Sequence, residues 1–269
     1  MLLQSESNLI SPGPTNASSL IVADAMMQDT QAVLLVGGMG TRLRAVVPSQ
    51  PKPLASVGDR PFLELLVRQL QHQGIHRLVL STGHLAGQIE SQFGDGRSLG
   101  VEIRYSRESQ PLGTAGAVKL ARGYLQEAAD FLVMNGDSFL EIDFRQLLRF
   151  HREHGGLVSM AVRRVQNAQR YGTVQVDAAG RVISFAEKTG SDAPGLVNAG
   201  VYVFNRGIFD YIPEGPASLE TDVFPRLLAH GVYALEQHGM FIDIGTPEDY
   251  ARAQAICDRL SDAALTGDY

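Results

Sequence analysis

From Gln31 onward, short apolar runs alternate with longer segments whose apolar residues recur at helical spacing, and this alternation restricts the fold more than any other feature. It predicts strands at 32–36, 76–82, 101–106 and 131–135, and helices at 61–74, 85–93 and 113–126. Strands separated by helices form βαβ units with right-handed crossovers and parallel neighbours. We therefore expect an α/β protein with a Rossmann-like, mixed but mainly parallel sheet flanked by helices.

The second half of the chain has a different pattern, in which strand-like segments follow one another closely. These segments are 157–164, 171–177, 181–188 and 196–204. The middle pair is joined by a short turn around Ala179 and Gly180, so we expect a small antiparallel excursion of the same sheet. A last apolar segment, 241–245, precedes a helix that Thr246 can cap, with Pro247 in its first turn.

The domain organisation follows from length and composition. Residues 1–30 lack sustained periodicity and contain the turn-forming run SPGPTNASS, so we expect an appended N-terminal extension and one domain over 31–269. The single cysteine, Cys257, excludes a disulfide within the chain. No Lys or Arg precedes Arg42, and no apolar run approaches the roughly 20 residues that span a bilayer. We expect a cytoplasmic protein without leader or membrane contact.

The net charge of -6 argues against nucleic acid as a partner, because nucleic-acid binding requires a broad basic face. The segment after the first strand is nevertheless basic: three glycines precede three cations, and the first acid is Asp59. Glycines let backbone N–H groups approach an anion, and guanidinium forks match phosphate oxygens. A solvated turn is the alternative, but the combination favours a polyphosphate site. The residues are Gly37, Gly38, Gly40, Arg42, Arg44 and Lys52.

Two carboxylates stand among apolar residues. Asp137 follows the strand at 131–135, and Asp243 lies between two isoleucines. A buried lone carboxylate is costly unless it is hydrogen-bonded or bound to a cation, and Mg²⁺ often takes one or two carboxylates plus substrate phosphates. Each aspartate alone is explained equally well by a turn or a helix start. Together they predict a magnesium site, whereas Glu141 and Asp143 are weaker candidates with solvated or helix-capping roles.

Two further motifs are ambiguous when taken alone. QPLGTAGA, residues 110–117, places small residues at a helix start, where backbone groups can reach a planar ligand, but close helix packing explains Gly113 and Gly116 as well. Glu187 and Lys188 could contact sugar hydroxyls and a sugar phosphate. Without other information, exposed charge is the simpler interpretation of that pair.

Taken together, these motifs resemble the sugar-1-phosphate nucleotidyltransferases, the nucleotide-sugar pyrophosphorylases, over roughly residues 32–255. The matching segments are GGMGTRLRAVVPSQPKPLASVGDRPFLE, LSTGHL, FGDG, PLGTAGA and FIDIGTPEDYARA. The resemblance implies a nucleotide-diphospho-sugar transferase type of fold, with 31–269 as a nucleotidyltransferase domain. It also implies an enzyme that transfers a nucleotidyl group from a nucleoside triphosphate to a sugar 1-phosphate, with Mg²⁺ as cofactor. Val36 and Thr189 depart from the family's usual alanine and proline.

The resemblance also implies residue roles. The catalytic set is Arg42 on the β and γ phosphates, Lys52 near the reacting phosphates, and Asp137 and Asp243 on magnesium. The nucleotide-binding set is Gly37, Gly38, Gly40, Thr41, Thr82, His84, Gln110 and Gly113. The sugar-phosphate set is Gly136, Glu187, Lys188, Asn198, Gly200 and Glu220.

Within the family, the combination of motifs is most similar to that of enzymes acting on heptose, and this resemblance implies GTP as donor, D-glycero-α-D-manno-heptose 1-phosphate as acceptor and a product used in cell-surface polysaccharide. Mannose 1-phosphate with GTP is the nearest alternative, and uridylyl or thymidylyl transfer stays open. A metal-dependent glycosyltransferase would normally carry Asp-X-Asp, which NGDSF lacks. A silent nucleotide-sugar sensor need not keep all four catalytic residues. The lack of a further domain argues against a bifunctional acyltransferase, and the sequence leaves a homo-oligomer open.

Overall fold

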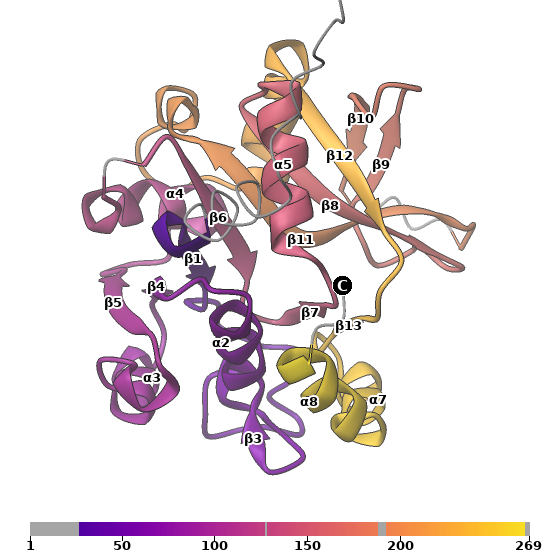
Figure 1. Cartoon of the computed structure of the whole chain (residues 1–269). Helices are drawn as coiled ribbons and strands as arrows, with labels where there is room; N and C mark the ends of the chain where they lie inside the picture. Colours follow the sequence, from indigo (N-terminus) through magenta and orange to yellow (C-terminus); the bar gives the residue numbers. More distant parts are fainter. Residues whose placement is uncertain (1–26, 127, 188–191, 267–269) are drawn as a thin grey trace, which may run out of the picture.

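The computed structural model describes residues 27–126, 128–187 and 192–266. Its nine-stranded sheet has a parallel half and an antiparallel half (Figure 1). The parallel half contains, in spatial order, β6 (Asp130–Asn135), β1 (Gln31–Leu35), β4 (Arg77–Thr82) and β5 (Glu102–Arg107). The predicted α/β fold with its parallel strands is confirmed.

The antiparallel half begins at β11 (Gly195–Asn205), which runs beside β6 in the opposite direction. β11 pairs with both β8 (Val158–Val165) and β9 (Thr173–Val176), and β9 forms a hairpin with β10 (Val182–Ala186). The expected antiparallel excursion is therefore present. A strand that the sequence did not predict, β12 (Val232–Gln237), lies parallel to β8.

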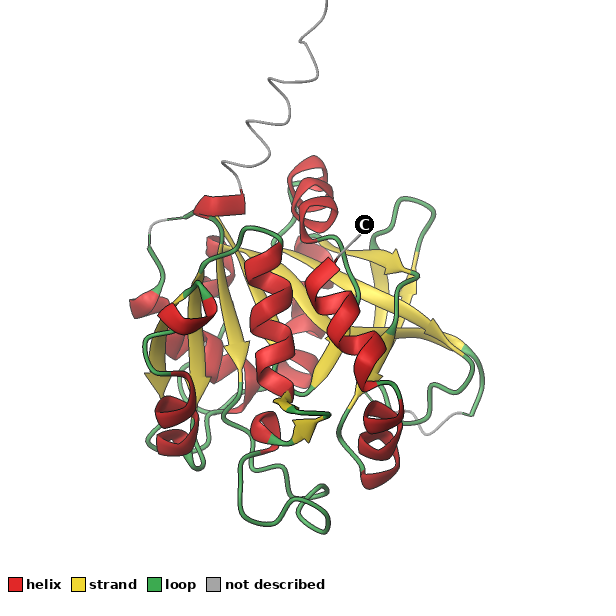
Figure 2. Cartoon of the chain, turned by 60° about the horizontal axis from the view of Figure 1, so that its bottom comes forward, coloured by secondary structure: helices red, strands yellow, loops and turns green. Residues whose placement is uncertain are grey.

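Helices cover both faces of the sheet (Figure 2). One face carries α2 (Phe62–His72), α3 (Ala86–Phe93), α5 (Phe144–His154) and α8 (Cys257–Thr266). The other carries α4 (Gly113–Ala121), the π-helical turn η5 (Leu219–Val223) and α6 (Phe224–Leu227). α7 (Pro247–Ala255) contacts the hairpin of β2 (Ser56–Val57) and β3 (Arg60–Pro61), and α8 packs on α2 (Figure 1). Short 3₁₀ turns occur at Lys52–Leu54, Arg97–Leu99, Arg122–Tyr124, Arg206–Asp210 and Leu228–His230.

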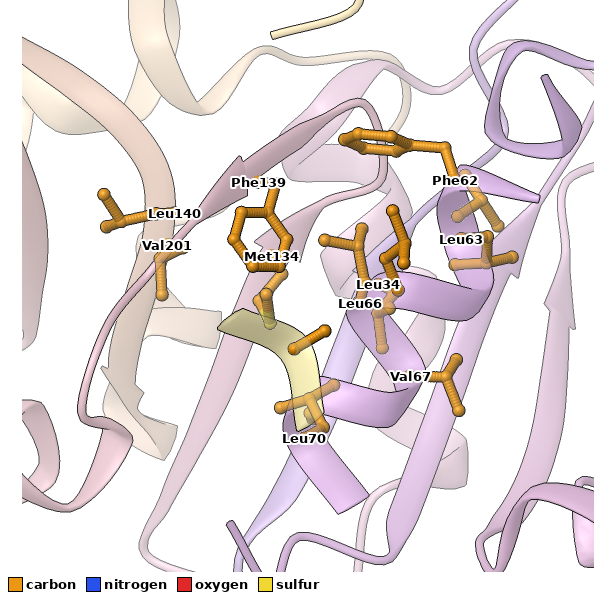
Figure 3. Packing of buried hydrophobic residues seen from close by; sticks show 14 of the residues in the cluster. Leu34, Phe62, Leu63, Leu66, Val67, Leu70, Met134, Phe139, Leu140 and Val201 are labelled. Carbon is orange, nitrogen blue, oxygen red and sulfur yellow. The ribbon is translucent and has the colours of Figure 1, made fainter. Parts of the chain in front are cut away.

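Two apolar cores form because neighbouring residues of β1 point to opposite faces of the sheet. Leu34 contributes to one core and Val33 to the other, and neither side chain is exposed. Figure 3 shows Leu34 and Met134 of the sheet packing against the α2 side chains between Phe62 and Leu70. This burial makes the sheet a rigid support for the loops at its strand ends.

A small second sheet joins two distant parts of the chain. β7 (Ser138–Leu140) pairs antiparallel with β13 (Phe241–Asp243), so that Asp243 stands opposite Ser138. The pairing continues through a hydrogen bond from the Ile244 N–H to the Asp137 carbonyl oxygen at 2.9 Å. The sequence did not predict β7, and this pairing brings Asp243 next to Asp137.

Glu141 and Asp143 have structural partners in this region. The Met240 N–H donates to the Glu141 carboxylate at 2.8 Å, which locks the loop before β13. Asp143 is the N-cap of α5 and accepts a hydrogen bond from the Gln146 N–H at 3.1 Å. The helix-capping interpretation of Asp143 is therefore confirmed.

Most of the extension expected at 1–30 lies outside the described residues. Of the remainder, Met27 is buried against the larger core, and Asp29 forms an ion pair with Arg77 at 3.0 Å. None of the helices in the described ranges has the length and apolar character needed to cross a bilayer.

Gly239 allows the close approach of β13 to β7, because a β-carbon there would overlap the Glu141 carbonyl oxygen. We predict that Gly239→Ala lowers the free energy of unfolding by about 1–3 kcal/mol, since backbone atoms must move to relieve the overlap. The control is Gly87→Ala in α3, where a β-carbon meets no atom within 4 Å. Urea unfolding of both variants checks the difference, and equal stability would contradict it.

Candidate active site

Two adjoining cavities lie where the carboxyl ends of the parallel strands meet the β7–β13 sheet. The larger, of about 610 Å³, is lined by the loops that follow β1, β4, β5 and β6. The smaller, of about 340 Å³, lies on the side of β11 and β13. Both are lined by Arg42, Thr114, Asn135 and Asp137. Two ligands bound side by side would therefore meet at Asp137.

A compact charge cluster occupies this junction. The Lys52 Nζ donates to Asp137 Oδ2 at 2.7 Å, and the lysine side chain is only 9% exposed. The same Nζ lies 3.5 Å from the position that a β-carbon on Gly245 would take, next to the Asp243 carboxylate. Lys52 and the two aspartates, which come from three separate segments, thus converge on one point.

The surroundings of Asp243 in this cluster disfavour the ionised form of its carboxyl group. Burial raises the pKa of Asp243 to about 6, and the nearby Asp137 carboxylate adds to this effect. The Lys52 ammonium and the hydrogen bond from the Gly245 N–H, 2.5 Å from Asp243 Oδ1, act in the opposite direction on this pKa. A further cation at this point would relieve the repulsion between the two carboxylates.

The glycine loop after β1 lies against Lys52. Gly40 has φ +57°, and a β-carbon there would be 2.9 Å from the Lys52 Cβ. Only glycine fits this approach without strain. Gly37, Gly38, Thr41 and the exposed Arg42 also line the larger cavity, so the predicted anion loop and Lys52 face the same space.

The predicted base and ribose residues occupy another wall of the larger cavity, with one exception. Gly113, at φ +69°, begins α4, and a β-carbon there would be 2.5 Å from the Ala217 carbonyl oxygen. Gln110 and His84 also line the cavity, and His84 contacts Arg44 at 3.3 Å. Thr82 is fully buried at the end of β4 and does not belong to the lining.

Four predicted sugar-side residues line the smaller cavity: Glu187, Asn198, Gly200 and Glu220. Asn198 is oriented by two hydrogen bonds, donated to the Tyr202 hydroxyl at 2.7 Å and accepted from the Gly200 N–H at 3.1 Å. Glu220 accepts hydrogen bonds from the Thr114 hydroxyl at 2.7 Å and the Ser218 hydroxyl at 2.8 Å. Gly136 lines the larger cavity, and Lys188 lies outside the described residues.

Sequence reasoning missed three prominent residues of the cavity walls. Glu108, in the larger cavity, directly follows β5, so the rule that ligands bind beyond strand ends could have found it. Arg170 and Tyr171 line the smaller cavity from the loop between β8 and β9, where no motif singles them out. Arg170 donates hydrogen bonds to the buried Asp249 carboxylate and to the Thr246 hydroxyl, which ties this loop to the start of α7.

Comparison with known proteins identifies a family match that begins at the start of β1. The family model for nucleotidyl transferase matches residues 31–259. A protein of Mycobacterium tuberculosis named mannose-1-phosphate guanylyltransferase is 40% identical over 228 residues, covering 83% of this chain and 63% of the relative. A mannose-1-phosphate guanylyltransferase catalytic subunit beta of Drosophila melanogaster is 36% identical over 235 residues, covering 86% and 64%. The chain thus spans less than two thirds of the length of these relatives.

A solved structure agrees in fold over nearly its whole length. HddC from Yersinia pseudotuberculosis, crystallised with GMP-PN, is 33% identical and superposes with a TM-score of 0.76. The match covers 84% of this chain and 98% of HddC. The chain therefore belongs to the nucleotidyl transferase family, within which its motifs are those of the sugar-1-phosphate nucleotidyltransferases.

Proposed function

We propose that this protein transfers a guanylyl group from GTP to a sugar 1-phosphate with the manno configuration. The products are pyrophosphate and a nucleotide sugar. The observation that carries the proposal is the convergence of Arg42, Lys52, Asp137 and Asp243 at the junction of two cavities. A reaction between two anionic substrates needs this concentration of cationic and metal-binding groups.

The chemistry needs little acid–base help from the protein. A phosphomonoester has a second pKa of about 6, so a sugar 1-phosphate is largely ionised near pH 7. One of its oxygens attacks the α-phosphorus of GTP, and the bond from that phosphorus to the oxygen of pyrophosphate breaks. The protein must hold the two anions in line and stabilise the departing pyrophosphate.

The larger cavity suits the nucleotide. Backbone N–H groups of the glycine loop and the Arg42 guanidinium bind the phosphates, while Gly113 and Gln110 contact the base and ribose. Lys52 stabilises the charge that grows on the leaving pyrophosphate. In the smaller cavity, Glu187, Asn198 and Glu220 accept or donate hydrogen bonds to sugar hydroxyls, and we assign Lys188 to the sugar phosphate.

We assign magnesium to Asp137 and Asp243. The raised pKa of Asp243 fits this role, because burial is its main cause and the Asp137 carboxylate adds to it, and a bound cation would oppose both effects. Within the described ranges no group of three His, Cys, Asp or Glu side chains could hold an ion, so phosphate oxygens would complete the coordination. The ion, when bound, would supply positive charge to the reacting phosphates.

The choice of substrates rests on relatives and motifs. Curated relatives are named mannose-1-phosphate guanylyltransferase, and HddC was crystallised with GMP-PN. Mannose 1-phosphate and D-glycero-α-D-manno-heptose 1-phosphate share the manno configuration and are the two acceptor candidates. We place the reaction in the cytoplasm and its product in cell-surface polysaccharide assembly.

Pyrophosphate release with a panel of substrates tests the proposal. GTP, ATP, UTP and dTTP are each combined with mannose, glucose and heptose 1-phosphates in the presence of Mg²⁺. We expect the highest kcat/KM with GTP and one of the two manno-configured acceptors. Absence of pyrophosphate with every pair, together with measurable binding of a nucleotide sugar, would instead identify a sensor.

Lys52→Ala tests the central cation. We predict that kcat falls by a factor on the order of 10² or more, because the ammonium acts on charge that develops in the transition state. The matched control is Lys119→Ala in α4, whose Nζ bonds the Ile212 carbonyl oxygen and Glu214 away from both cavities. Steady-state kinetics measures both variants, and a Lys52→Ala effect confined to KM would contradict this role.

Asp243→Asn tests the metal site through stability. The pKa of Asp243 in the folded state, about 6, exceeds the ordinary 3.8, so the folded state binds this proton more tightly than the unfolded state. The free energy of unfolding therefore falls as the pH rises from about 4 to 6, and the full loss is present above pH 6. Without divalent cations at pH 7.5, we predict that the variant gains on the order of 1–3 kcal/mol of unfolding free energy. Below pH 4 this gain disappears.

The same experiment includes added Mg²⁺. We expect the cation to stabilise the wild type and to have little effect on Asp243→Asn. Asp59→Asn serves as control, because Asp59 is an exposed carboxylate outside the cavities. Urea unfolding with and without Mg²⁺ gives all the values. A variant less stable than the wild type at pH 7.5 in chelator would show that Asp243 is not a strained carboxylate.

A further inference from the structure

The loop between β8 and β9 forms a wall of the smaller cavity that the mechanism above does not use. Arg170, Tyr171 and Gly172 all line this cavity. The Gly172 carbonyl oxygen accepts a hydrogen bond from the Asn198 N–H at 2.9 Å, and a β-carbon on Gly172 would be 2.8 Å from Glu187 Oε2. Asn198 and Glu187 are assigned to the sugar, so the position of this loop determines part of the surface that the acceptor would contact.

The same loop contacts the chain on both sides of Asp243. Before Asp243, the ring of Tyr171 packs against the ring of Phe241, with centroids 5.6 Å apart. After Asp243, the Arg170 guanidinium forms an ion pair with the Asp249 carboxylate in the first turn of α7. The loop therefore joins the acceptor wall to the segment that carries a proposed metal ligand.

Asp249 is a strong anchor for this loop, because its side chain is only 3% exposed. Its Oδ2 accepts hydrogen bonds from the Thr246 hydroxyl, at 2.8 Å, and from Arg170. Its Oδ1 pairs with Arg252 at 3.2 Å. Loss of one partner of a buried ion pair leaves an uncompensated charge, whereas a pair between two exposed side chains contributes little.

The orientation of Arg170 favours an action through the protein rather than direct contact with a phosphate. An arginine binds a phosphate most strongly through two parallel N–H donors. Both terminal nitrogens of Arg170 already donate to α7, one to the Thr246 hydroxyl at 3.1 Å and the other to the Asp249 carboxylate. This two-point contact fixes the guanidinium and, with it, the loop that continues into Tyr171.

We propose that Arg170 is a positioning residue, whose ion pair with Asp249 holds Tyr171 and Gly172 in place and so sets the shape of the acceptor cavity. This inference rests on the nucleotidyl transfer proposed above and concerns how its acceptor is aligned. A misplacement of about 1 Å can cost roughly 100-fold in rate, even when the altered residue does not touch the reacting atoms. Arg170 does not line the larger cavity, so binding of the nucleotide should not depend on it.

The test is a double-mutant cycle with Arg170→Ala and Asp249→Asn, measured by steady-state kinetics with both substrates varied. The acceptor is the sugar 1-phosphate that the wild type uses best. We expect each single variant to lower kcat/KM for the acceptor roughly 10- to 100-fold, while KM for GTP stays within about 2-fold. The double variant should be no worse than the more impaired single variant, because both changes remove the same contact.

Two further variants support the cycle. Arg170→Lys keeps the charge but not the two-point contact, so it should lie between the wild type and Arg170→Ala. The matched control is Arg164→Ala in β8, whose guanidinium pairs with Glu236 at 3.1 Å outside both cavities. This control should keep the wild-type constants, and thermal unfolding checks that each variant is folded.

Hydrogen exchange of the free protein gives a second measurement, which needs no substrate and decides the matter if Asp249→Asn does not fold. In Arg170→Ala we expect faster exchange of the amides that hold the loop, such as the Tyr171 N–H on the Ala168 carbonyl oxygen and the Asn198 N–H on Gly172. Exchange in α3 should not change. Unaltered exchange around the loop would overturn the positioning role.

The kinetic outcomes separate this inference from the proposed function. A wild type that releases no pyrophosphate with any substrate pair would refute nucleotidyl transfer, and hydrogen exchange would still decide whether Arg170 holds the loop. Wild-type kinetics in Asp249→Asn beside a large loss in Arg170→Ala would indicate direct contact with the acceptor and overturn positioning. A KM for GTP that rises as much as KM for the acceptor would also overturn it, since the damage would not be confined to the acceptor cavity.

Discussion

The antiparallel pairing of β7 with β13 is the contact on which the site depends. It places Asp243 beside Asp137, although the two residues are separated by most of the second half of the chain. The placement is unfavourable for the ionised carboxylate of Asp243, because burial raises its pKa and the Asp137 carboxylate raises it further, while the Lys52 ammonium opposes these effects only in part. Backbone hydrogen bonds and buried neighbours such as Phe139 and Ile242 hold the carboxylates together against this repulsion.

The two cavities divide the work of binding around that cluster. The nucleotide side is built from backbone and small residues. A β-carbon on Gly40 would overlap Lys52, and a β-carbon on Gly113 would overlap the Ala217 carbonyl oxygen. The sugar side is built from polar side chains that other residues orient, such as Asn198 through the Tyr202 hydroxyl. Phosphates bind well to N–H groups and cations, whereas a sugar needs donors and acceptors in a defined pattern. The division therefore follows the chemistry that each proposed ligand would require.

Much of the fold and part of the site were predictable because their signals are local. The strands around the glycine loop are short apolar runs, and the Thr246 cap with Pro247 is a pattern of neighbouring residues, confirmed by the hydrogen bond from the Asp249 N–H to the Thr246 hydroxyl. β7 and β12 were missed because they are short or weakly patterned and are stabilised by partners distant in sequence. Arg170 was missed for the same reason, since its partner is the buried Asp249.

By itself, the sequence determined the alternation of strands and helices, the basic glycine loop after β1, and the residue types that suit phosphate and magnesium. These properties depend on composition and spacing along a few turns of chain. Only the tertiary structure decided which of these residues meet, that Lys52 lies between two aspartates, that Thr82 is behind the cavity wall, and that Glu108 is on it. The physical reason is that burial, charge repulsion and hydrogen-bond partnership are set by distances through space, and these are fixed by packing between segments far apart in the chain.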